Sequence, residues 1–197
     1  MKYAKLFSPM KIGNLEIKNR IVMAPMLMGF GQFNGNATDK MMDYYEERAK
    51  GGTGLIITEI TRVNDLTGAS SFGQLAASKD RNIESMACLA ERIHKHDAKI
   101  FVELHHPGRQ NVNLMVNTVP ISVLCDKIMP KNLYSRLLYG GIVPIGKKLV
   151  EKDLFFRSAG PSRVEKSKFS ESANRALSKA EIKKIISQFG DAALRVK

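Results

Sequence analysis

The sequence predicts an α/β fold in which parallel strands alternate with helices. Three short apolar runs, at 20–24, 55–58 and 99–104, are separated by two segments with helical periodicity, 38–50 and 80–93. Strand and helix alternating with short connections is typical of parallel βα units. Because crossovers between parallel strands are right-handed, we expect the carboxyl ends of all three strands at one edge of the sheet.

An amino-terminal hairpin is expected before the first strand. Apolar residues at Leu6-Phe7 and Leu15-Glu16-Ile17 flank a segment whose Gly13-Asn14 pair favours a tight turn. Such a hairpin is suited to plug the amino-terminal end of a barrel. The first strand, Arg20–Ala24, then ends at Pro25.

The first helix is expected from Thr38 to Lys50. Thr38 is a favourable N-cap, and Asp39 suits the positive end of the helix dipole. Gly51-Gly52 then ends the helix, because glycine tolerates the left-handed conformation found at helix ends. Leu55–Thr58 follows as a second buried strand.

The second helix is expected to begin at Asp80, which we predict as its N-cap. Cys88 lies on this helix, where a buried free thiol is the usual state of such a cysteine. The third strand, Lys99–Leu104, is continuously apolar, which suits a parallel sheet covered on both faces. The apolar face of the second helix consists of Ile83, Met86, Ala87, Ala90 and Ile93.

The carboxyl-terminal part of the chain combines an irregular segment with a clear helix. Residues 110–177 predict no firm secondary structure, and we interpret them as a long loop or insertion after the third strand. Ser178–Glu181 is a capping box that starts the last helix. A βα unit leads on to a further strand, so we expect the chain to be part of a larger protein. The apolar stripe of this helix is Ile182, Ile185, Ile186, Phe189, Ala193 and Val196.

Composition is that of an ordinary globular protein. The 197 residues are 44% hydrophobic, and no run approaches the ~18 apolar residues of a membrane span, so we expect no membrane association. The start has no signal-peptide pattern, and two distant cysteines fit a cytoplasmic protein without disulfides. The net charge of +12 is dispersed, with no block of five or more like charges, so we expect no nucleic-acid binding. A patch that attracts an anionic ligand explains the excess equally well.

Polar residues follow the third strand, at the end where parallel α/β sheets bind their ligands. Glu103, His105 and His106 come first, and Pro107-Gly108-Arg109 follows. A carboxylate with imidazoles can bind a metal, act as acid and base, or hydrogen-bond a polar ligand. No third metal ligand stands at close spacing. A structural alternative also stays open, in which Glu103 pairs with a nearby Arg or Lys and the histidines bond the backbone.

The end of the first strand, Met23–Met28, is apolar and contains Pro25. Proline donates no hydrogen bond, so it leaves a flat apolar surface that suits a planar aromatic cofactor. Core packing followed by a turn is the structural alternative. The Gly-rich loop Gly29–Gly35 lacks the Gly-x-Gly-x-x-Gly and Gly-Lys-Ser/Thr patterns of nucleotide phosphate sites.

Two strings, Asn19–Met26 and Leu104–Arg109, together resemble the old yellow enzyme family of FMN-dependent oxidoreductases. The similarity is strongest to the bacterial branch that contains 2,4-dienoyl-CoA reductase, trimethylamine dehydrogenase and bile-acid enoate reductases. Further matching segments are Leu6–Pro9, Ile12-Gly13, Tyr44–Ile60, Gly160–Ser162 and Arg175–Leu177.

The resemblance implies an incomplete (β/α)₈ TIM barrel, made of the first three to four βα units and an amino-terminal hairpin. Residues 1–197 would form the amino-terminal part of a flavin-binding domain, with the loop or insertion at about 110–177. FMN would lie across the carboxyl ends of the strands. Leu27 matches a site where other members place Cys or Thr, and Glu103 a site that is commonly Gln. The positions matched to the cofactor site are Ala24, Pro25, Met26, Leu27, Ile60 and Glu103.

The implied reaction is that of an ene-reductase. NAD(P)H would reduce the flavin, which would reduce a small α,β-unsaturated carbonyl or enoyl-CoA-like substrate. The family's substrate anchors, tyrosine proton donor, phosphate-binding arginine and 4Fe-4S cysteines have no match in the chain. We therefore assign no catalytic residue and no metal ligand, and we expect the chain by itself to be inactive; oligomers are possible. The alternatives are part of another TIM-barrel enzyme for a phosphorylated or CoA-linked substrate, or a basic binding module.

Overall fold

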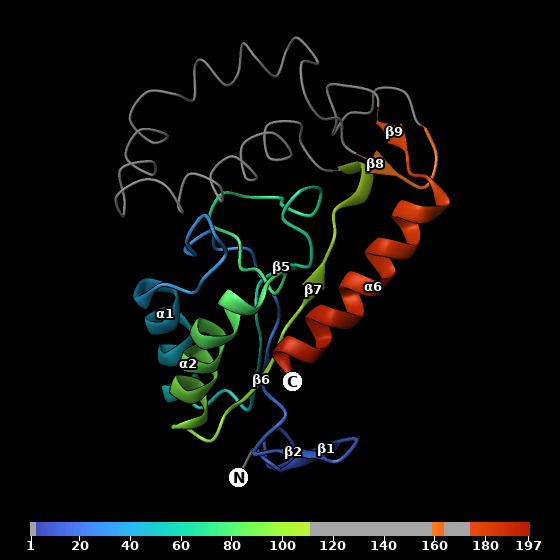
Figure 1. Ribbon diagram of the computed structural model, residues 1–197. Coiled ribbons are helices and arrows are strands. Elements are labelled where there is room, and N and C mark those ends of the chain that lie inside the picture. The colour runs from blue at the N-terminus through green and yellow to red at the C-terminus, as the bar shows by residue number, and fades with distance from the viewer. Residues whose placement is uncertain (1–2, 111–158, 164–173) are drawn as a thin grey trace.

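A parallel sheet of three strands lies at the centre of the computed structural model, which describes residues 3–110, 159–163 and 174–197 (Figure 1). Its strand order is β3-β4-β6, and both neighbouring pairs are parallel. Helix α1 (Asp39–Lys50) connects β3 to β4, and α2 (Ile83–His94) connects β4 to β6. The predicted βα alternation and strand direction are therefore confirmed. The strands are β3 (Val22–Met23), β4 (Leu55–Ile57) and β6 (Lys99–Phe101).

The strands are shorter than predicted, and after two of them the chain returns to strand structure a few residues later. After β4 the chain forms β5 (Thr61–Arg62), and after β6 it forms β7 (Leu104–His105); these two pair in parallel. The prediction of one strand over 99–104 is therefore wrong. The backbone N–H of Glu59 leaves the ladder and donates to the Tyr45 hydroxyl at 2.7 Å. This hydrogen bond lies at the break between β4 and β5.

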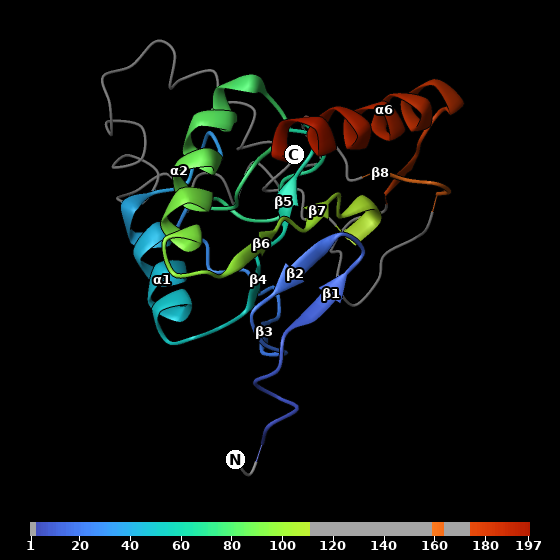
Figure 2. The same ribbon diagram turned by 90° about the horizontal axis from the view of Figure 1, so that it is seen from below.

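The amino-terminal hairpin forms with the predicted turn and second arm, but its first arm is Met10–Ile12 and not Leu6-Phe7. Strands β1 (Met10–Ile12) and β2 (Leu15–Ile17) are antiparallel, and Gly13 has a φ of 59° in the turn between them. The hairpin lies next to the amino-terminal end of the sheet, opposite the polar strand ends (Figures 1 and 2). Its role as a barrel plug stays a prediction.

Helix α1 has the predicted ends. The Thr38 hydroxyl oxygen accepts a hydrogen bond from the Met41 N–H at 3.2 Å. At the other end Gly51 is the C-cap, and Gly52 has a φ of 97°. Residues of α1 and α2 pack against the sheet to form the main core, which includes Met41, Tyr45, Leu89 and Ile93 from the helices and Ile56 from β4.

Helix α2 begins differently from the prediction. A 3₁₀ turn, Asp80–Asn82, precedes it, and Asp80 does not cap it. The Asp80 carboxylate instead accepts a hydrogen bond from Arg195 at 2.7 Å. Leu89, which the predicted apolar face omitted, is fully buried, and Ile83 and Ala87 are exposed. Cys88 precedes the buried Leu89 and lies about 100° away from it around the helix, where it is exposed to solvent. The prediction of a buried thiol is therefore wrong.

The described parts of the predicted 110–177 loop contain two short parallel strands, β8 (Ala159–Gly160) and β9 (Arg175–Ala176). Helix α6 (Lys179–Val196) follows and starts at the predicted capping box: Ser178 and Glu181 exchange hydrogen bonds of 2.8 and 3.2 Å. No helix in the described ranges has the length and apolar character needed to cross a membrane.

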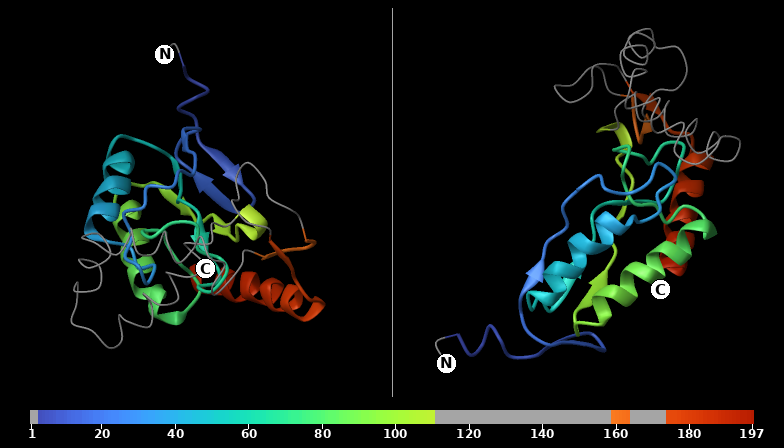
Figure 3. Two further views of the ribbon diagram at one scale, coloured as in Figure 1. Left: turned by 90° about the horizontal axis from the view of Figure 1, so that it is seen from above. Right: turned by 90° about the vertical axis from the view of Figure 1, so that its left-hand side faces the viewer.

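Helix α6 lies across the strands from α1 and packs its later turns against β7 and α2 (Figures 1 and 3). Its apolar stripe is only partly the predicted one. Ala192 is fully buried, whereas Ile186 is 66% exposed and Ala193 is also exposed. Ala192 packs in a second small core with Val63 and Ala77.

Candidate functional site

Three chain segments leave the carboxyl edge of the sheet side by side, because β3, β4 and β6 are adjacent and parallel. The segment after β3, 24–27, is exposed at every residue; Met26 is 54% and Leu27 42% exposed. Ile60 and Glu103, from the neighbouring segments, are half-buried. The structure thus brings Ala24, Pro25, Met26, Leu27, Ile60 and Glu103 to one edge of the sheet.

Glu103 presents a carboxylate at this edge. Its backbone carbonyl accepts the Thr61 N–H at 2.8 Å, but among the described residues its carboxylate forms no ion pair and no hydrogen bond. Burial lowers the pKa of His105, and the negative charge of Glu103 offsets part of that effect. Within the described residues the carboxylate thus acts on His105 through its charge and not through a hydrogen bond.

The two histidines bond to side chains of the loop between β5 and α2. The His105 ring nitrogen Nε2 lies 3.1 Å from the Ser70 hydroxyl, and His106 Nε2 lies 2.9 Å from the Thr67 hydroxyl. His106 Nδ1 accepts the Gly108 backbone N–H at 3.1 Å. The neutral His106 ring therefore carries its proton on Nε2 and donates it to Thr67. Burial lowers the pKa of both histidines, so they are neutral at pH 7.

Glu59 is a site residue that the sequence analysis did not identify. Its side chain is fully buried, although it lies only two residues after β4. Oε2 accepts the backbone N–H groups of Met28 and Gly29 at 2.7 and 3.2 Å, and Oε1 accepts that of Leu75 at 3.0 Å. Burial raises the pKa of Glu59, and these hydrogen bonds oppose the rise. One carboxylate therefore joins the segment after β3 to the loop after β5.

Arg62 is a second fully buried charge that the sequence analysis did not identify. Its Nη1 donates to the Gln74 carbonyl at 2.9 Å, and its Nη2 donates to the Phe33 carbonyl at 2.8 Å. Its Nε donates to the Asp65 carboxylate at 2.9 Å. Asp65 also receives hydrogen bonds from Ser78 at 2.8 Å and Arg81 at 3.0 Å.

The two loops also bond directly to each other. The Gly31 N–H donates to the Gly73 carbonyl at 2.7 Å, and the Ala76 N–H donates to the Gly35 carbonyl at 2.9 Å. A Cβ on Gly73 would lie 2.1 Å from the Gly29 carbonyl oxygen, so only glycine permits this approach. The loops after β3 and β5 therefore form one layer beside the strand ends.

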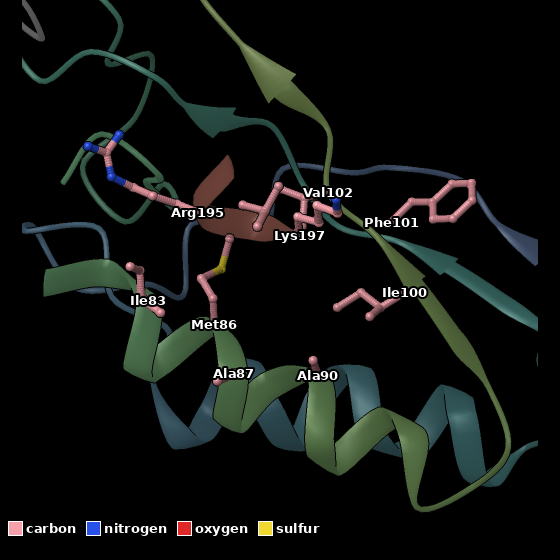
Figure 4. A pocket seen from close by; sticks show the side chains of 10 residues that line it. Ile83, Met86, Ala87, Ala90, Ile100, Phe101, Val102, Arg195 and Lys197 are labelled. Carbon is pink, nitrogen blue, oxygen red and sulfur yellow. The ribbon is translucent and has the colours of Figure 1, made fainter. Parts of the chain in front are cut away.

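A cavity of about 540 Å³ lies elsewhere, between α2, β6 and the end of α6 (Figure 4). Its lining is mostly apolar and includes Met86, Ile100 and Val196. None of the six predicted site residues lines it. The cavity is a gap in the helix–sheet layer, and the chemistry-bearing residues lie at the strand ends.

Asp65 makes a testable contribution to acid stability. Burial alone would raise its pKa, but the charge and hydrogen bond of Arg62, with those of Ser78 and Arg81, lower it overall. An acid with a lowered pKa stabilises the fold above its unfolded pKa of about 3.9, and this contribution is lost as pH falls through the folded pKa. We expect urea denaturation to show wild type more stable than Asp65→Asn at pH 5–7, with the difference shrinking below about pH 4. A difference independent of pH would contradict this assignment.

Comparison with known proteins places the chain in a family. The sequence profile of the NADH:flavin oxidoreductase / NADH oxidase family matches residues 5–197. The chain belongs to this family. The old yellow enzyme resemblance predicted from the sequence is thereby confirmed.

Two bacterial proteins are similar in sequence to part of this chain. The NADH oxidase of Thermoanaerobacter brockii is 43% identical over 108 residues, which are 55% of this chain and 17% of the oxidase. An NADPH dehydrogenase of Listeria welshimeri is 40% identical over 110 residues, 55% of this chain and 32% of the dehydrogenase. This chain therefore spans less than a third of either relative.

A solved structure has the same fold. The old yellow enzyme homologue from Zymomonas mobilis superposes with a TM-score of 0.70 at 21% identity, over 98% of this chain and 46% of that protein. The likeness shows an α/β fold shared with part of an old yellow enzyme.

Proposed function

We propose that this chain supplies the amino-terminal βα units, and one part of the flavin site, of an FMN-dependent NAD(P)H oxidoreductase of the ene-reductase type. One observation carries the proposal: an exposed apolar segment, 24–27, lies at the carboxyl edge of a parallel sheet, beside Ile60 and the Glu103 carboxylate, which has no ion pair or hydrogen bond within the part of the chain that the structure describes. The family to which the chain belongs is named for NADH and flavin.

The residues present fit a flavin. Ala24 to Leu27 offer an uncovered apolar surface, and covering such surface with a flat ring system is favourable. The Leu27 side chain has no hydrogen-bond donor, and Glu59 already occupies the N–H groups of Met28 and Gly29. Any polar contact from this segment to the ring must therefore come from the backbone before Met28.

Glu103 would set the electrostatic balance at the same site. FMN, when bound, supplies hydride transfer from NAD(P)H to the β-carbon of an α,β-unsaturated carbonyl or enoyl-CoA-like substrate. A carboxylate beside a reduced, anionic flavin repels it, so Glu103 disfavours that form relative to a glutamine at the same position. The chain's own residues thus bind and orient the ring, and Glu103 shifts its reduction equilibrium.

Flavin content tests the proposal. We expect the open reading frame that encodes this chain, expressed in full, to purify yellow, to release FMN on denaturation, and to oxidise NADH or NADPH with cyclohexenone. The 197-residue chain by itself is expected to be colourless and inactive, because it covers less than half of the solved homologue. A full product without flavin, but with a bound phosphorylated or CoA-linked anion in its mass spectrum, would contradict the proposal.

A further inference from the structure

One peptide group in the loop after β5 is held from both sides by buried charges. Its carbonyl, from Gln74, accepts a hydrogen bond from Arg62 at 2.9 Å. Its N–H, from Leu75, donates to Glu59 Oε1 at 3.0 Å. Both charged side chains are fully buried, so water does not compete for these bonds. The 74–75 peptide is therefore a fixed point at the sheet edge.

The same two side chains reach from this point to the loop after β3. Glu59 Oε2 accepts the N–H groups of Met28 and Gly29, and Arg62 Nη2 donates to the Phe33 carbonyl. Glu59 thus acts as acceptor toward both loops, and Arg62 acts as donor toward both. No apolar side chain of similar size can make these bonds, because it has neither hydrogen-bond donors nor acceptors.

The location of these bonds ties them to the proposed flavin site. Met28 and Gly29 follow directly on the exposed segment 24–27, so fixing their amides fixes the end of that segment. A buried carboxylate is costly unless hydrogen bonds satisfy it, and three backbone N–H groups do so for Glu59. The same bonds fix the positions of the Met28 and Gly29 amides.

We propose that Glu59 is a positioning residue for the flavin-lining segment 24–27, which it holds against the 74–75 peptide that Arg62 fixes from the other side. We call the hydrogen bonds of Glu59 and Arg62 to the two loops the clamp. The role of the clamp in flavin binding rests on the proposed function, but the clamp itself does not.

The substitution Glu59→Gln tests the clamp without changing side-chain volume. Glutamine has one acceptor oxygen and one amide nitrogen, and the nitrogen must face N–H donors on one side. We expect amide hydrogen exchange in the 197-residue chain, measured by NMR, to be about tenfold faster either at Met28 and Gly29 or at Leu75. This is the increase in rate expected when one buried hydrogen bond is lost. Unchanged exchange at all three amides would overturn the proposal.

Two further variants separate the clamp from general destabilisation. Leu89→Ala opens the core that Leu89 shares with the Leu75 side chain but removes none of the hydrogen bonds to Glu59, so the three amides should keep their protection relative to the core. Glu59→Asp keeps the charge but is one methylene too short to reach both loops. We expect Glu59→Asp to give faster amide exchange in one of the two loops, as Glu59→Gln does. If Glu59→Gln does not fold, Glu59→Asp is measured in its place. Equal loss of protection in Leu89→Ala would overturn the proposal.

FMN affinity of the full open-reading-frame product tests positioning itself. We expect Glu59→Gln to bind FMN at least about tenfold more weakly, in step with the faster exchange of the loop amides. Faster exchange with unchanged affinity would overturn the positioning role. If the wild-type product binds no flavin, the proposed function fails, and the exchange experiment still decides whether the clamp exists.

Discussion

Replacing Arg62 with methionine is expected to lower the free energy of unfolding by about 3–5 kcal/mol, the range for removing one partner of a buried ion pair. Methionine fills similar space but donates no hydrogen bond. The Gln74 and Phe33 carbonyls would then be buried without a donor, and Asp65, which is 14% exposed, would lose its nearest cation. Urea denaturation of both proteins at pH 7 measures the difference.

Arg81→Met is the matched control for this prediction. Arg81 contacts the same Asp65 carboxylate at 3.0 Å, but it is 31% exposed and makes no bond to either loop carbonyl. Exposed ion pairs contribute about 0–1 kcal/mol, so we expect a loss below about 1 kcal/mol. Equal losses in the two variants would contradict the view that Arg62 stabilises the loops through their backbone carbonyls.

Features that depend on neighbours in sequence could be predicted well. The caps at Thr38 and at Ser178–Glu181 form as expected, since each needs only a side chain and a backbone amide three residues away. Asp80 has the right residue type for a cap, but it bonds Arg195, which lies 115 residues further along the chain. No local pattern carries information about that partner.

The residues of the candidate site also differ in how well they could be predicted from the sequence. The six predicted residues lie at strand ends and in family motifs, and both are recognised from consecutive residues in the sequence. Glu59 and Arg62 bond mainly to backbone groups in two loops, and a backbone N–H or carbonyl has no sequence signature of its own. The available signal was two charged residues, Glu59 and Arg62, in the short stretch from Thr58 to Val63 that follows a buried strand. Buried charges of this kind require a partner.

The substitution Gly73→Ala is expected to cost about 1–3 kcal/mol of unfolding free energy, the range for overpacking a closely packed site. The added Cβ would lie 2.1 Å from the Gly29 carbonyl oxygen and 2.5 Å from its carbon. These are backbone atoms, so no side-chain rotation relieves the clash. The loops must separate, which breaks the 2.7 Å bond from the Gly31 N–H to the Gly73 carbonyl.

Gly190→Ala is a control for which we expect the opposite change in stability. Gly190 lies within α6, and a Cβ there meets no atom within 4 Å. Alanine in a helix interior is favoured over glycine by about 0.5–1 kcal/mol, so thermal denaturation should show Gly190→Ala more stable than wild type. Gly73→Ala should be less stable than wild type in the same measurement. If both variants were stabilised, the two loops would not form a closely packed layer, and the segment 24–27 would lack its support beside the sheet edge.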